Sequence, residues 1–135
     1  MEQKAYSKTR IFSFAQLQVA SADLRKAWED LKNSPTSNVS TFVGSYNNWY
    51  STVFQTASGV TDIALSIVDL YFGTFRDGTY NHWNMVENAE DILQGTRNGV
   101  AVKVRFDYFP TGIMMPDGGA ILGVQLSNGT WITPS

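Results

Sequence analysis

The spacing of apolar residues changes at Gly99, and this change constrains the fold more than any other feature of the sequence. Before Gly99, in residues 11–32 and 82–94, apolar residues recur at three- and four-residue steps, which is the period of a helix. From Gly99 to Tyr108 they alternate with polar residues, which is the period of a strand with one buried and one solvated face. Helices followed by alternating strands are typical of the α+β class, here with an antiparallel β-sheet or a partial β-sandwich.

Three helices are predicted, over residues 11–32, 60–72 and 82–94. The first is an amphipathic N-terminal helix whose apolar side carries Leu17, Leu24 and Leu31. The segment 60–72 is ambiguous, because some of its apolar residues alternate as in a strand while its polar residues line one helical stripe. We favour the helix for this segment.

The sheet is predicted mainly from residues 38–45, 99–109, 119–127 and 130–134. The pair Asn128-Gly129 separates the last two segments and is a strong hairpin signal. A chain of 135 residues suits a single domain. We therefore expect one domain over 1–135, made of the N-terminal helix 11–32, a mixed region 38–95 and a C-terminal β-meander 99–134.

Charge and cysteine content exclude several classes of function. Ten Lys and Arg residues against twelve Asp and Glu residues give a net charge of −2, which lacks the positive footprint that nucleic-acid binding needs. Zero cysteines and one histidine remove disulfides, thiolate metal sites and paired-histidine zinc sites. We expect no nucleic-acid partner, no metal and no cofactor. Residues 1–20 also lack the pattern of a secretory signal.

Candidates for catalysis are few. His82 would need an orienting carboxylate to act as a general base, for which Glu87 and Asp69 are the available residues. The ordinary interpretation is an imidazole that serves only as a hydrogen-bonding group. We therefore expect a binding protein rather than an enzyme.

The segment 33–61 contains no Asp, Glu, Lys or Arg. At its centre, residues 46–51 combine three aromatic residues with two amides, which suits a neutral or zwitterionic partner such as a sugar ring or a choline headgroup. The alternative is that Trp49 and Tyr50 belong to the core and its rim. A similar group of aromatics and amides recurs in residues 78–83, and we interpret both segments as turns that present these side chains.

Three short motifs carry a resemblance to a known family: Asn48-Trp-Tyr-Ser51, Asp69-Leu-Tyr-Phe-Gly73 and Arg76-Asp-Gly78. Over roughly residues 42–108 the chain resembles the actinoporins, which are sphingomyelin-seeking pore-forming toxins, and the related fungal fruit-body lectins. The resemblance implies a secreted protein. It also implies a pocket for a headgroup or glycan and a helix that enters the bilayer, for which 11–32 has the matching position and character.

These observations predict a binding protein for a neutral glycan or a zwitterionic phospholipid headgroup, active at a membrane surface and assembled as a homo-oligomer. The alternative is a self-assembling structural or interaction protein, such as a viral or phage component, without a small-molecule ligand. The predicted ligand-binding residues are Tyr46, Trp49, Tyr50, Ser51, Tyr71 and Phe72. The predicted membrane contacts are Phe12, Phe14 and Leu17.

Overall fold

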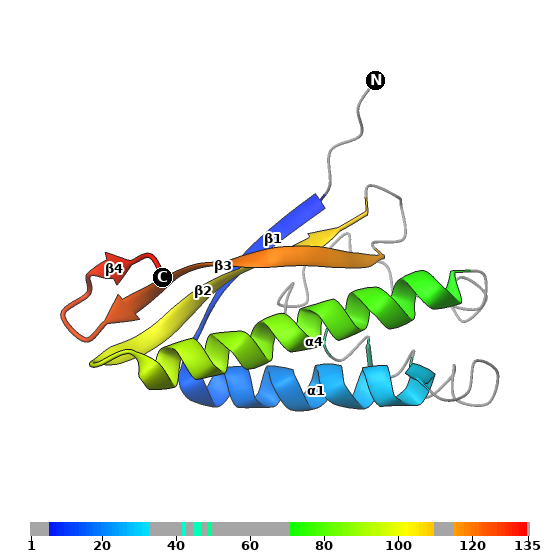
Figure 1. Cartoon of the computed structure of the whole chain (residues 1–135), viewed down its shortest axis with the longest axis horizontal. Helices are drawn as coiled ribbons and strands as arrows, with labels where there is room; N and C mark the ends of the chain where they lie inside the picture. Colours follow the sequence, from blue (N-terminus) through cyan, green and yellow to red (C-terminus); the bar gives the residue numbers. More distant parts are fainter. Residues whose placement is uncertain are drawn as a thin grey trace, which may run out of the picture.

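The computed structural model describes residues 6–32, 42, 45–46, 49, 71–109 and 115–134. Within them the chain forms one four-stranded sheet of order β1-β2-β3-β4, in which every neighbouring pair is antiparallel. Two long helices, α1 (Phe14–Lys32) and α4 (Phe72–Gly95), lie side by side on one face of this sheet and run in opposite directions (Figure 1). The predicted α+β class with an antiparallel sheet is confirmed.

Helix α1 begins with a reciprocal cap. The backbone N–H of Gln16 donates to Ser13 Oγ over 3.3 Å, and the backbone N–H of Ser13 donates to Gln16 Oε1 over 2.8 Å. The prediction that this helix starts at residue 11 is wrong, because Ile11 and Phe12 are the last residues of strand β1 (Tyr6–Phe12). The Ser-x-x-Gln spacing is the signal that places the boundary at Ser13.

Helix α4 contains the predicted helix 82–94 but begins much earlier, at Phe72. Its first turns carry Gly73 and Gly78, which are poor helix formers. Packing explains the glycine at position 78. Gly78 is buried where α4 passes so close to Pro116 that a Cβ would lie 2.0 Å from the Pro116 carbonyl oxygen. Residues 60–70 of the predicted helix 60–72 lie outside the described part of the chain, so the described residues hold two long helices instead of three.

Three of the strands follow the prediction: β2 (Gly99–Tyr108), β3 (Pro116–Leu126) and β4 (Trp131–Ile132). The β3–β4 hairpin turns at Asn128-Gly129, where Gly129 has a φ of 89° and its N–H donates to the carbonyl of Leu126 over 2.8 Å. Most of the predicted strand 38–45 lies outside the described residues. Its members Phe42 and Ser45 are helical, so the strand prediction is wrong at these two positions.

Strand β1 was not predicted, and its pairing with β2 explains why. Residues opposite one another in a sheet share a face. Lys8 pairs with the buried Phe106 and Arg10 pairs with the buried Val104, so two of the four inward positions of β1 carry charge. A charged residue at an apolar position hides the alternation that predicts a half-buried strand. Charges on the inward face are one way in which edge strands avoid pairing with another chain.

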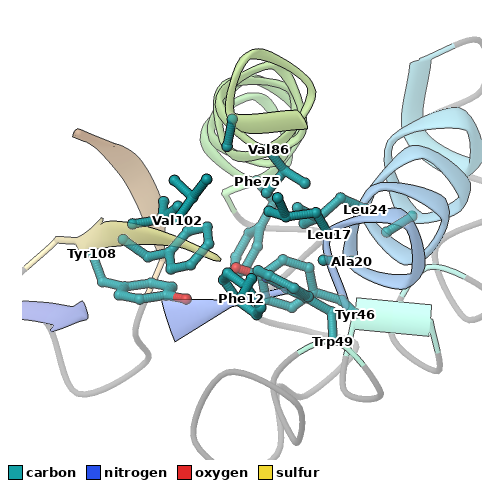
Figure 2. Close-up of a cluster of buried hydrophobic side chains, with 14 of the residues drawn as sticks. Phe12, Leu17, Ala20, Leu24, Tyr46, Trp49, Phe75, Val86, Val102 and Tyr108 are labelled. Atoms are coloured by element: carbon teal, nitrogen blue, oxygen red, sulfur yellow. The ribbon is translucent and has the colours of Figure 1, made fainter. Parts of the chain in front are cut away.

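The core fills the space between the sheet and the two helices (Figure 2). Phe106 of β2 lies near its centre and meets Phe12 and Trp49 edge to face, with ring centroids 6.0 and 5.2 Å apart. The other large buried side chains come from α1, α4, β2 and the helical positions 42 and 46: Leu17, Leu24, Leu31, Phe75, His82, Tyr108, Phe42 and Tyr46.

Candidate functional site

Two predicted ligand-binding residues, Tyr46 and Trp49, lie in the core. Neither exposes any surface to solvent. Tyr46 packs against Phe75 and Trp49 against Phe106, and Figure 2 shows both beside Phe12 and α1. A side chain with no exposed surface does not contact a ligand from solvent, so their assignment as surface contacts is wrong. Full burial removes more of the apolar area of these rings from water than a position at the rim of the core would. Of the two alternatives for Trp49, a ligand contact or a core residue, the structure shows a core residue.

The remaining predicted ligand contacts divide between two places. Tyr50 and Ser51 lie outside the described residues. Tyr71 and Phe72 lie at the start of α4, where Tyr71 is 40% exposed and Phe72 is half-buried, with the guanidinium carbon of Arg76 5.7 Å from the Phe72 ring centroid. Tyr71 therefore shares no solvent-facing pocket with the buried Tyr46 and Trp49.

The residues predicted to contact a membrane also lie in or against the protein core. Phe12 and Leu17 are buried in the core, so their assignment to a membrane is wrong for this structure, and Phe14 is half-buried against the same core. The apolar face of α1 packs on α4 and on the aromatic core residues instead of facing outward. Among the described residues no helix is both long and apolar enough to cross a bilayer.

His82 is a structural cross-link. Its Nε2 lies 2.9 Å from the carbonyl oxygen of Gly118 and 3.1 Å from that of Asp107, so the ring ties α4 to β3 and β2. Carbonyl oxygens only accept, which puts the ring proton on Nε2. Burial lowers the pKa of His82 to about 4, although the two hydrogen bonds and the Asp107 charge act in the opposite direction. The hydrogen-bonding interpretation of this residue matches its surroundings.

A second aromatic cluster joins α1 to α4 at the molecular surface. Trp28 of α1 stacks on Trp83 of α4, with ring centroids 5.3 Å apart and planes inclined by 25°. Tyr80 contacts both rings, at 5.3 Å from Trp28 and 5.9 Å from Trp83, and keeps 43% of its surface exposed. These three residues are here called the aromatic cluster.

A hydrogen-bond network fixes the inner ring of the aromatic cluster. The indole Nε1–H of Trp83 donates to Glu87 Oε1 over 3.0 Å and approaches Ser21 Oγ at 3.3 Å. Ser21 Oγ donates to the same carboxylate oxygen over 2.8 Å. A charged acceptor strengthens such bonds. Glu87 therefore holds Trp83 in one orientation, and Trp83 in turn supports Trp28.

An open hollow with a volume of about 470 Å³ lies against the aromatic cluster. Trp28 and Tyr80 line it with aromatic surface, and Arg76, Asp77 and Asn81 add polar groups. Arg76 Nε donates to Asp77 Oδ1 over 3.0 Å, so the two charges offset each other. We call this site the aromatic hollow. It offers flat apolar surface beside an amide and a charge-balanced ion pair, and its volume falls in the range of roughly 300–1,000 Å³ that is typical of small-molecule sites.

The described residues include no group of three or more His, Cys, Asp and Glu side chains that is arranged to hold a metal ion. On the same helix, burial and, after it, the neighbouring charges of Glu87 and Asp91 raise the pKa of Glu90. The residues that line the aromatic hollow, two aromatic side chains, an amide and an ion pair, suit it to stacking and hydrogen bonding.

The sequence analysis missed this site because it interprets residues 78–83 as a turn. The recurrence of aromatics and amides in that segment was the available signal, since Tyr80 and Asn81 both line the aromatic hollow. They lie within α4 rather than in a turn. The partner Trp28 comes from a distant part of the sequence.

No protein-family model, no curated protein and no solved structure matches the chain. The resemblance to actinoporins and fungal fruit-body lectins therefore stays a prediction.

Proposed function

We propose that this protein binds a neutral sugar ring in the aromatic hollow. The observation that carries the proposal is that Trp28 and Tyr80 line one hollow together with Asp77 and Asn81, and that Tyr80 is 43% exposed. The C–H groups of a sugar ring pack on aromatic faces, while carboxylate and amide groups bond its hydroxyls. The mutual pairing of Arg76 and Asp77 leaves the lining close to neutral, as a neutral ligand requires.

A zwitterionic headgroup is the competing ligand from the same sequence prediction. Quaternary ammonium groups are held by aromatic cages. Trp28 and Tyr80 are tilted by 53° to each other and form two walls, and Arg76, the cation that would meet a phosphate, already pairs with Asp77. A sugar needs only one ring face and nearby hydrogen-bonding groups, so this lining favours the sugar.

The test is a calorimetric titration with methyl β-glucoside, methyl α-glucoside, N-acetylglucosamine and phosphocholine. We expect one of the sugars to bind and the variant Tyr80→Ala to weaken it by roughly tenfold, equivalent to about 1.4 kcal/mol. Trp131→Ala is the matched control, because Trp131 is an exposed aromatic (36%) on β4 outside the aromatic hollow. Binding of phosphocholine alone, or equal losses in both variants, would contradict the proposal.

Self-assembly through the sheet is the second candidate function. Phe12 is buried and neighbouring strand residues alternate in direction, so Ile11, which is 52% exposed, faces away from the core. Its register partner Lys103 places its ammonium 4.5 Å from the Trp131 ring centroid on the same sheet. A second copy of the chain would cover these exposed apolar residues.

Sedimentation equilibrium over a wide concentration range tests self-assembly. We expect Ile11→Glu to dissociate the assembly and Val19→Glu, a change at an exposed residue of α1, to leave it intact. A monomer at all concentrations would contradict this second candidate and leave the sugar proposal untouched.

A further inference from the structure

A second hollow adjoins the aromatic hollow along helix α4. Its volume is about 210 Å³, and it shares two lining residues, Asp77 and Asn81, with the aromatic hollow. These residues are four apart on one helix, so they lie on the same face, one turn above the other. They therefore form the boundary between the two hollows.

The second hollow has its own apolar and polar walls. Phe109 and Pro116 contribute apolar surface, and Thr74 and Asp117 contribute a hydroxyl and a carboxylate. Gly78 lies between them, where its lack of a side chain lets α4 and β3 approach closely. The second hollow thus repeats the combination of apolar surface and hydrogen-bonding groups found in the aromatic hollow.

The polar group at the boundary is held in place. Asn81 Nδ2 donates to the backbone carbonyl of Asp117 over 3.4 Å, a long contact that orients the amide. The carboxylate of Asp77 accepts from Arg76, and because a carboxylate has several acceptor positions it retains capacity for a ligand hydroxyl. Both side chains are available to a ligand that passes from one hollow to the other.

The size of the second hollow argues against an independent ligand. Its volume of about 210 Å³ lies below the range of roughly 300–1,000 Å³ for separate small-molecule sites, whereas the aromatic hollow falls within that range. With two shared lining residues it is an extension of the larger hollow.

We infer that the site takes two consecutive sugar residues of a neutral oligosaccharide, one in each hollow, with the glycosidic linkage crossing Asp77 and Asn81. This inference rests on the proposed sugar-binding function. The aromatic hollow stacks the first ring on Trp28 and Tyr80. The second hollow receives the next ring against Phe109, with Thr74 and Asp117 bonding its hydroxyls.

The test compares each monosaccharide with its disaccharide by calorimetry: methyl β-glucoside with cellobiose, methyl α-glucoside with maltose, and N-acetylglucosamine with its β-1,4-linked dimer. We expect the disaccharide of the preferred sugar to bind about tenfold more tightly. Asp117→Ala and Thr74→Val remove polar groups of the second hollow only, so each should abolish most of this gain and leave monosaccharide affinity unchanged. Asp91→Ala, at an exposed carboxylate of α4 outside both hollows, is the control.

The outcomes separate the two proposals. Monosaccharide binding that Tyr80→Ala weakens, without a gain for the disaccharide, overturns the two-residue site and leaves the sugar-binding function standing. A gain that survives both Asp117→Ala and Thr74→Val also overturns it, because the second ring would then lie elsewhere. Failure of every sugar of either length overturns both proposals. Melting curves recorded for each variant separate a lost contact from a lost fold.

Discussion

Trp28 and Trp83 join the two helices by stacking their indole rings, with centroids 5.3 Å apart. Only Trp28 lines the aromatic hollow, and Trp83 lies behind it with its N–H bonded to Glu87. The position of the ring that faces the hollow is therefore set by a carboxylate that does not line it. Packed and hydrogen-bonded support of this kind keeps a binding surface in one conformation before the ligand arrives.

Changing Glu87 should affect both stability and the aromatic cluster. Glu87→Ala removes the acceptor that the Trp83 N–H and the Ser21 hydroxyl share, and it leaves Trp83 only the longer contact to Ser21 Oγ. Loss of hydrogen bonds to a charged group should cost about 1.5–3 kcal/mol. Glu87→Gln retains an acceptor oxygen, so we expect a smaller loss. Urea unfolding measures the free energy, and near-ultraviolet circular dichroism measures the tryptophan environment. Equal losses in the two variants would show that charge, rather than the acceptor, holds Trp83.

His82 should make the free energy of unfolding depend on pH between the pKa of its ring in the folded chain and the higher pKa in the unfolded chain. In the folded chain burial lowers the pKa from 6.5 to about 4. Above pH 6.5 the ring is neutral in both states, so its contribution is fully present. Between pH 6.5 and about 4 the unfolded chain binds a proton that the folded chain does not, and stability falls by up to roughly 3 kcal/mol, at 1.36 kcal/mol per pKa unit.

The measurement is the free energy of unfolding from pH 8 to pH 4, and the comparison variant is His82→Gln. Glutamine donates an N–H without titrating, and His82 is the only histidine in the chain. The variant should therefore lose stability less steeply over this interval. Parallel curves for the two proteins would mean that the imidazole is not shielded from protonation.

The sequence predicted those parts of the fold that local patterns determine. Strand β2 alternates between buried and half-buried residues from Val102 to Tyr108, and the Asn128-Gly129 pair is a local turn signal, so both were predicted. Strand β1 was missed because Lys8 and Arg10 occupy inward positions, and its stability comes from pairing with β2, far away in the sequence. Strand propensity depends strongly on such context.

The candidate site was less predictable than the fold, because it depends on how two helices meet. Trp28 and Tyr80 belong to different helices, and the apolar pattern of one helix does not predict which of its residues contact the other helix. Trp49 shows the converse: a segment rich in aromatics and amides fits a ligand site and a packed core equally well. Composition does not separate these alternatives, whereas tertiary packing does.

Gly78 should be intolerant of substitution although it lies inside a helix. A Cβ there would lie 2.0 Å from the Pro116 carbonyl oxygen, which is backbone, so Gly78→Ala forces α4 away from β3. Overpacking of this kind costs about 1–3 kcal/mol or more. Among the described residues no atom lies within 4 Å of a Cβ placed on Gly73 of the same helix, so Gly73→Ala should stabilise by about 0.5–1 kcal/mol. Thermal unfolding of the pair is the measurement, and a stable Gly78→Ala protein would contradict the close approach.

Trp49 should behave as a core residue. It is completely buried and packs its ring edge to face with Phe106 at 5.2 Å. Trp49→Ala removes this contact and leaves a cavity, at a cost of about 3–5 kcal/mol, whereas Trp131→Ala at an exposed site should cost much less. Chemical denaturation of both variants makes the comparison. If Trp49→Ala unfolded at the same denaturant concentration as the unmodified protein, the ring would have to lie at the surface, and the original prediction of a ligand contact at this position would return.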